Sequence, residues 1–121
     1  MNLEKTLDLI NSEGTILGLY LSKNKKYFLG SKTTDSIETI YFKVTDHELK
    51  MYINGHITLN ELYGFSDNIF IVTKSGNDKK TYMFDQYSCN LTYGDLSYDQ
   101  INIDMKPIIG LDEFSFNVDE E

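Results

Sequence analysis

The spacing of apolar residues near the start of the chain is typical of a helix. Leu3, Leu7 and Ile10 stand at positions i, i+4 and i+7, which places them on one face of an α-helix. Glycine is common just after the last helical turn, and Gly14 follows this stripe at that point. The pattern therefore predicts a helix over residues 3–12.

Further along, the pattern changes to the short apolar runs and two-residue alternation that are typical of β-strands. A nearly continuous apolar stretch, followed by a lysine-rich turn and a second apolar run, predicts a hairpin over residues 15–32. Alternation of apolar and polar residues predicts a strand at 37–44. A β-branched run followed by the turn Ser-Gly-Asn-Asp predicts a second hairpin over residues 69–87.

Between these last two strand regions, two helix start signals follow each other closely. Each has a threonine with a glutamate three residues later, flanked by two apolar residues that can pack together, and a glycine follows that we expect to be a left-handed C-cap. The threonine and glutamate side chains can satisfy backbone N–H groups that lack partners in the first turn. We therefore predict helices at 46–54 and 59–63. The residues of the signals are Thr45, Glu48, Val44, Leu49 and Gly55 for the first helix, and Thr58, Glu61, Ile57, Leu62 and Gly64 for the second.

The last third of the chain is less regular. Residues 97–100 have the form of a third helix start, whereas Ile103 and Met105 favour a strand equally, so both alternatives stay open. Strand hairpins interrupted by a helical insert predict an α+β fold built on an antiparallel β-sheet of about five or six strands. We expect one globular domain over residues 1–110 and an acidic C-terminal tail over residues 111–121.

The middle of the chain resembles an uncharacterised family of small bacterial domains. The residues that carry the resemblance are Tyr41-Phe42-Lys43-Val44, Leu49 to Gly55 and Ile57 to Tyr63, which match a pattern of the form LxxxxxGxITLxxLF. In that family a hairpin and a third strand lead into a helix-turn-helix insert, and two more strands follow. The resemblance covers roughly residues 10 to 90 and implies a shared fold. No activity is attached to the family.

Charge is distributed unevenly along the chain and limits the classes of partner. The 121 residues have a formal net charge of −8, of which the acidic tail contributes −5. All eleven cationic side chains are lysines. Arginine is the side chain best suited to paired hydrogen bonds with phosphates and base edges, so its absence argues against direct nucleic-acid binding. The longest apolar run, at 16–21, is far shorter than the about 20 residues of a membrane helix, so we expect no membrane segment.

Residue types that could carry out chemistry are present, but no recognised spacing groups them. His47 and His56 are the only histidines, and no HxH, HxxxH or CxxC pair indicates a metal site. Cys89 is the only cysteine, and a lone thiol suits a reducing cytoplasm. The aspartates between 95 and 104 lack the spacing of a calcium loop. We therefore expect no catalytic, cofactor-binding or metal-binding residues.

Tyrosine is the most informative residue type for function. Nine tyrosines are spread over nearly every predicted element. Tyrosine favours protein interfaces because it combines rigid contact area with a polar tip, although half-buried strands favour it for structural reasons as well. We therefore predict a non-enzymatic, cytoplasmic protein-binding domain, of the kind that suits an accessory, immunity or anti-defence protein of a bacterium or phage.

Two other functions stay open, and so does the oligomeric state. An acidic surface could mimic nucleic acid and block a basic groove on another protein. A small hydrolase or ligand-binding enzyme could have a site that the fold assembles around His47 or His56. An exposed edge strand would allow a homodimer.

Overall fold

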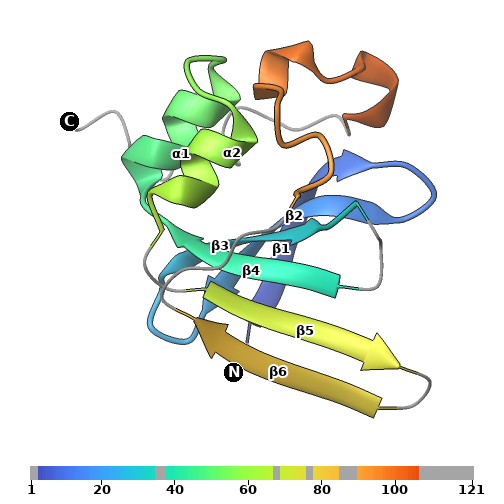
Figure 1. Cartoon of the computed structure of the whole chain (residues 1–121). Helices are drawn as coiled ribbons and strands as arrows, with labels where there is room; N and C mark the ends of the chain where they lie inside the picture. Colours follow the sequence, from blue (N-terminus) through green and yellow to red (C-terminus); the bar gives the residue numbers. More distant parts are fainter. Residues whose placement is uncertain (1–2, 35–37, 67–68, 76–77, 85–89, 107–121) are drawn as a thin grey trace.

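The fold combines an antiparallel sheet with a layer of helices, so the predicted α+β class is confirmed (Figure 1). The computed structural model describes residues 3–34, 38–66, 69–75, 78–84 and 90–106; for 70–84 it describes the backbone and the side chain of Val72. The strands are β1 (Leu3–Asn11), β2 (Thr15–Ser22), β3 (Tyr27–Lys32), β4 (Glu38–Val44), β5 (Ile69–Ser75) and β6 (Asp78–Phe84). The helices are α1 (Asp46–Ile53) and α2 (Leu59–Gly64), followed by the 3₁₀ turns η1 (Tyr98–Gln100) and η2 (Ile103–Met105).

The sheet follows the order of the chain. Its strand order is β1-β2-β3-β4-β5-β6, and every neighbouring pair is antiparallel. Short turns join β1 to β2 and β2 to β3, whereas α1 and α2 fill the connection between β4 and β5. Consecutive elements are thus neighbours in space, which is the usual solution for an antiparallel sheet.

The predicted N-terminal helix over residues 3–12 is wrong, because these residues form the edge strand β1. Leu7 pairs with Leu19 and Ile10 pairs with Leu17, so three residues of β1 span two residues of β2. Such a bulge places residues three apart on the same side of a strand, which reproduces the spacing of a helix. Gly14 lies in the β1–β2 turn at φ +125° and ends no helix.

The two helix start signals operate as predicted. The Oγ1 atom of Thr45 accepts from the backbone N–H of Glu48 at 3.1 Å, and the Glu48 carboxylate accepts from the Thr45 N–H at 3.1 Å. Thr58 and Glu61 form the same pair of bonds at 3.2 and 2.8 Å. Gly55 follows α1 at φ +82°.

One helix ending differs from the prediction. We expected Gly64 to be a left-handed cap after the second helix, but it is the last residue of α2, and Phe65 caps the helix at φ −80°. The backbone N–H of Phe65 reaches the carbonyl of Leu62, so the last turn tightens without a residue of positive φ.

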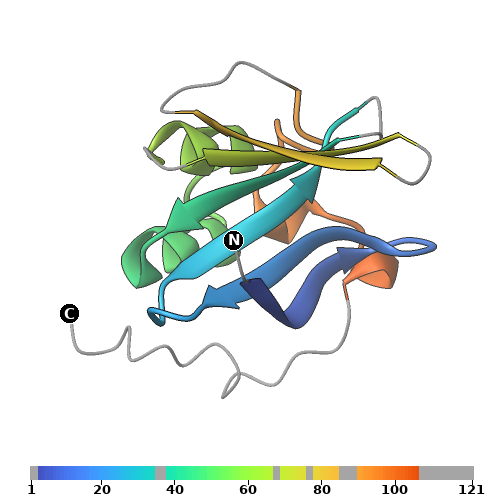
Figure 2. The ribbon, with the colours of Figure 1, turned by 90° about the horizontal axis from the view of Figure 1, so that it is seen from below.

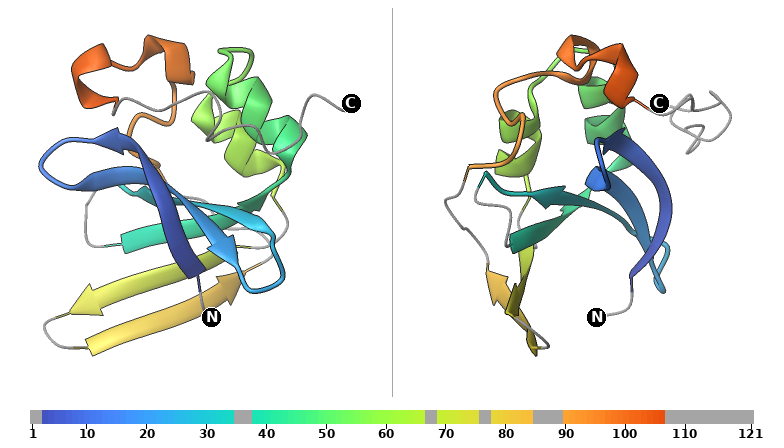
Figure 3. Two further views of the ribbon diagram at one scale, coloured as in Figure 1. Left: turned by 180° about the vertical axis from the view of Figure 1, so that it is seen from behind. Right: turned by 90° about the vertical axis from the view of Figure 1, so that its right-hand side faces the viewer.

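The main core lies between the sheet and the helices (Figure 3). Alternate residues of the strands point towards the helices and are buried against apolar residues of α1, α2 and the segment 90–106. The strand residues include Leu17, Leu19, Leu29, Ile40 and Phe42; the residues that cover them include Leu49, Tyr52, Leu59, Leu62, Leu91, Tyr98 and Ile101.

The segment 90–106 ties the helices to the N-terminal strands. The backbone N–H of Asn60 donates to the carbonyl of Gly94 at 2.8 Å, and the Tyr98 hydroxyl donates to the carbonyl of Leu9 at 2.8 Å. Residues 98–100 and 103–105 form 3₁₀ turns, so the strand alternative at Ile103 is wrong.

Cys89 and the acidic tail lie outside the described residues. None of the described helices has the length and hydropathy needed to cross a membrane.

Candidate functional site

The two faces of the sheet differ in what covers them. α1, α2, η1 and η2 lie on one face, and no described helix lies on the other, which Figure 2 shows from below. Strand residues alternate between the faces, so the neighbours of the buried core residues point to this second face. We name it the lysine–tyrosine face, and its described residues include Lys5, Asp8, Tyr20, Phe28, Lys32, Tyr41 and Lys43.

The centre of the lysine–tyrosine face consists of two tyrosine rings over two glycines. Gly18 and Gly30 are direct cross-strand neighbours. A Cβ atom at Gly30 would lie 2.7 Å from ring atoms of both Tyr20 and Tyr41, so the rings occupy the space of the missing side chain. The rings meet edge to face, with centroids 5.1 Å apart and planes at 82°. This geometry is favourable for aromatic pairs and holds both rings in place.

Both tyrosines of the pair stay protonated over the physiological pH range. Burial raises the pKa of Tyr41 to about 12, and the Tyr20 phenol reinforces this. Burial also raises the pKa of Tyr20, and the nearby Asp8 charge acts in the same direction. The phenols can therefore donate and accept hydrogen bonds, but they are poorly suited to act as bases.

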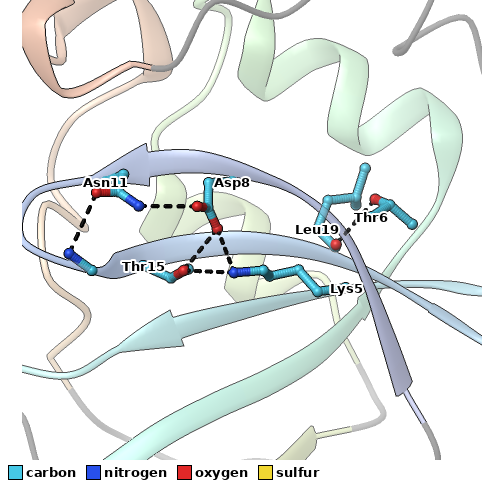
Figure 4. Close-up of polar contacts among 7 residues, drawn as sticks. Lys5, Thr6, Asp8, Asn11, Thr15 and Leu19 are labelled. Atoms are coloured by element: carbon cyan, nitrogen blue, oxygen red, sulfur yellow. Dashed lines mark hydrogen bonds and ion pairs between the residues drawn. The ribbon is translucent and has the colours of Figure 1, made fainter.

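A polar cluster adjoins the pair at the β1–β2 hairpin (Figure 4). The Asp8 carboxylate lies 3.0 Å from the Lys5 ammonium and accepts from Thr15 Oγ1 at 2.7 Å and from Asn11 Nδ2 at 2.9 Å. Lys5 also donates to Thr15 Oγ1 at 2.9 Å. Burial alone would raise the pKa of Asp8, but the bonds from Thr15, Lys5 and Asn11 and the Lys5 charge outweigh it and lower the pKa below 3.8.

The polar cluster and the tyrosine pair form one continuous surface. The methyl group of Thr15 lies 3.2 Å from the position of a Cβ on Gly18, which the Tyr20 ring also approaches. Phe28, the direct neighbour of Tyr20 on β3, is only 5% exposed although no described helix covers this face. The face thus has an apolar and aromatic centre with charged groups around it.

Lysines dominate the charge of this face, although the chain as a whole is acidic. Lys32 pairs with Thr39, and Thr39 pairs with Val72. Residues two apart along a strand share a face, so position 74 belongs to the face of Val72, and Lys74 pairs in register with Lys79. Among the strand positions that the structure describes, the face therefore has five lysines, at 5, 32, 43, 74 and 79, and one aspartate, a formal charge of +4.

The helical layer has the opposite charge. We use this name for residues 45–64 and 90–106, which contain six acidic residues and two lysines, a formal charge of −4. Five of the six acids lie in the first turn of α1, α2, η1 or η2, where their charge is stabilised by the positive end of the backbone dipoles. The described positions on the two sides of the sheet thus have formal charges of opposite sign.

The structure does not bring the histidines into a site. His47 and His56 are both exposed, and no group of three potential metal ligands occurs among the described residues. Asp95 accepts from Asn60 Nδ2 at 2.9 Å, and Asp99 accepts from the Ser97 hydroxyl, so these carboxylates hold the helical layer together. The alternative of an enzyme site around either histidine therefore has no geometric support in the described part of the chain.

Sequence reasoning noted the tyrosines but did not find this surface. The signals were Gly18 and Gly30, which interrupt two neighbouring strands, and Tyr20 and Tyr41, which alternate with core residues. A glycine within a strand often marks a close approach by another group. Only the pairing register of β2, β3 and β4 reveals that the approaching groups are the rings of Tyr20 and Tyr41.

Comparisons with known proteins identify no relative. No family model, no curated protein and no solved structure matches the chain. The resemblance to an uncharacterised family of bacterial domains therefore stays a prediction.

Proposed function

We propose that this chain is a non-enzymatic protein-binding domain and that the lysine–tyrosine face is its binding surface. The observation that carries the proposal is the Tyr20–Tyr41 pair, whose rings pack over Gly18 and Gly30 with lysines at nearby strand positions. A cytoplasmic accessory, immunity or anti-defence role in a bacterium or phage is the setting that we propose for it.

The chemistry of the face favours binding over bond-making. Its phenols have raised pKa values, and its one described carboxylate, Asp8, is held by three hydrogen-bonding neighbours. A general base needs a pKa near the working pH and access to its substrate, and neither group meets both conditions. Rigid tyrosines lose little conformational entropy on binding, which makes them good interface anchors.

The charge of the face favours a partner with an acidic surface or segment. The lysine positions surround the aromatic centre, and complementary charge speeds encounter and suppresses wrong partners. A protein segment with both acidic and aromatic or apolar side chains would match the rim and the centre together.

Photo-crosslinking in the native host tests this proposal. A benzophenone amino acid replaces Thr39 or Lys43 on the face, and His47 or Glu61 on the helical layer serves as the matched control position. We expect discrete crosslinks to one other protein from positions 39 and 43 and none from positions 47 and 61. The charge-reversed variant Lys32→Glu should reduce the yield from position 43 several-fold, because the complementary field is lost.

Two results would contradict the proposal. One is crosslinking from the helical positions alone, which would move the interface to the other side. The second is saturable binding of an oligothymidine to the face at physiological salt, because aromatic residues and lysines also suit single-stranded nucleic acid.

The acidic helical layer supports a second candidate, the nucleic-acid mimic. Its formal charge of −4 lies on the opposite side of the molecule from the lysines. This candidate predicts that the crosslinks arise from positions 47 and 61 and that the captured protein loses its nucleic-acid binding in the presence of this domain. A captured protein with an acidic surface at the crosslinked site would rule it out.

A further inference from the structure

We propose that the acidic tail of this chain, residues 111–121, docks on the lysine–tyrosine face and competes there with the partner. The inference deepens the proposed function and rests on it, since it concerns the regulation of the same surface.

Charge is the first argument. The acidic tail contains five acids and no lysine, whereas the lysine–tyrosine face has five lysine positions and one aspartate. The helical layer, the other side on which the tail could lie, has a formal charge of −4 and would repel it. Opposite charges within a Debye length of about 8 Å attract at physiological salt, so the face is the favoured side.

The pattern of the tail is the second argument. Phe114, Phe116 and Val118 stand two residues apart, which places them on one side of an extended segment. The acids at 112–113 and 119–121 flank them at both ends. An apolar centre with acidic ends is complementary to a face with an aromatic centre and lysines around it.

The starting point of the tail is the third argument. The Lys106 ammonium donates to the carbonyl of Tyr98 at 3.2 Å and lies 5.0 Å from the centre of the Tyr98 ring, and the Tyr98 hydroxyl reaches the Leu9 carbonyl on β1. The chain after residue 106 therefore begins beside the strand that carries Lys5 and Asp8.

The length of chain that follows is sufficient to cross the face. Fifteen residues span up to about 50 Å when extended. Six strands at about 4.8 Å spacing make a sheet only about 24 Å wide. The tail can thus pass round the β1 edge and reach Tyr20 and Tyr41 without any change in the described fold.

A competition experiment on the full chain tests the inference. In one variant the five tail acids are neutralised by Asp112→Asn, Glu113→Gln, Asp119→Asn, Glu120→Gln and Glu121→Gln. The probe is a synthetic peptide with the sequence LDEFSFNVDEE, which is added to the native and the neutralised chains and followed by NMR shifts of the Gly18, Gly30 and Tyr41 amides. A tethered segment has an effective concentration on the order of millimolar, so we expect the peptide to bind the neutralised chain about tenfold more tightly.

Two control peptides separate the contributions. One carries asparagine and glutamine in place of the acids, and the second carries serine in place of both phenylalanines. We expect both to bind the neutralised chain more weakly than the parent peptide, and we expect 0.5 M salt to weaken the parent peptide and leave the first control unchanged, because salt screens charge pairs.

The outcomes distinguish the inference from the proposed function. Equal affinity of the peptide for the two chains would overturn the inference but leave the face as a binding surface. Absence of peptide binding to either chain, or shifts confined to α1 and α2, would also overturn the inference, and crosslinking would still decide the proposed function.

A spin label tests whether the tail docks on its own chain. A nitroxide attached at position 115 in the variant Ser115→Cys/Cys89→Ser should broaden the NMR signal of the Gly30 amide within one chain. Broadening that occurs only between labelled and unlabelled chains in a mixture would assign the tail to a second copy and overturn docking within one chain.

Discussion

The two faces of the sheet are filled in different ways. Towards the helices, large apolar side chains such as Phe42 and Leu62 are completely buried in one core. On the lysine–tyrosine face, the space above Gly18 and Gly30 is filled by the rings of two tyrosines that are only partly buried. One sheet thus has a side specialised for stability and a side that presents polar aromatic groups.

Burial on the two faces of the sheet has separate causes. The helical layer is positioned by local devices, the two capping boxes, and covers its face with a second layer of structure. The lysine–tyrosine face depends on the absence of side chains at two positions, which lets the tyrosine rings approach the backbone of the sheet closely. Substitutions on the two faces should therefore differ in size and in kind.

The largest expected effect comes from removing core volume beneath the helices. Leu62→Ala should lower the free energy of unfolding by about 2–5 kcal/mol, because it loses burial and leaves a cavity. Urea denaturation followed by circular dichroism measures this. The matched change on the other face, Lys43→Ala, should stay within about 0.5 kcal/mol, and equal losses for both would erase the distinction between the faces.

The next effect tests the packing of the tyrosine rings over Gly30. Gly30→Ala should lower the free energy of unfolding by about 1–3 kcal/mol, because its Cβ would lie 2.7 Å from two ring atoms and force the rings to move. Gly64→Ala is the matched control, since a Cβ there meets nothing within 4 Å and alanine favours a helix. Thermal denaturation that ranks Gly64→Ala as the more harmful change would contradict this description of the face.

The hydroxyl groups of two buried tyrosines in the helical layer should contribute differently to stability. Tyr98→Phe should cost about 1–2 kcal/mol of unfolding free energy, because the carbonyl of Leu9 loses its donor. Tyr52→Phe should be neutral or stabilising by up to about 1 kcal/mol, because the Tyr52 hydroxyl is buried without a hydrogen-bond partner within the described part of the chain. Chemical denaturation of both variants checks the ranking, and a larger loss for Tyr52→Phe would imply a partner for that hydroxyl.

The smallest effect is a dependence on pH at the edge of the lysine–tyrosine face. The pKa of Asp8 is lowered on folding, so its carboxylate stabilises the fold above the ordinary pKa of 3.8 and stops doing so as the pH falls through the lowered value. Asp8→Asn should therefore cost about 0.5–1 kcal/mol at pH 7, and this difference should shrink as the pH falls below 3.8. Urea titrations at several pH values measure it, with the exposed Glu13→Gln as control; a difference that grows towards low pH would contradict the assignment.

The sequence by itself determined the elements whose signals are local. Both capping boxes, the hairpin over residues 15–32 and the antiparallel α+β class are readable because each depends on side chains within a few residues of one another. The excess of acid in the chain and the lack of arginine are equally visible in the sequence.

Only the tertiary structure decided which way Leu3 to Asn11 would fold and which residues share the lysine–tyrosine face. A bulged strand and a helix can have the same apolar spacing, and the availability of β2 as a partner selects the strand. Likewise, Tyr20 and Tyr41 are 21 residues apart and meet because β2, β3 and β4 are in register. Cross-strand register is set by burial across the whole sheet, so no local pattern in the chain specifies it.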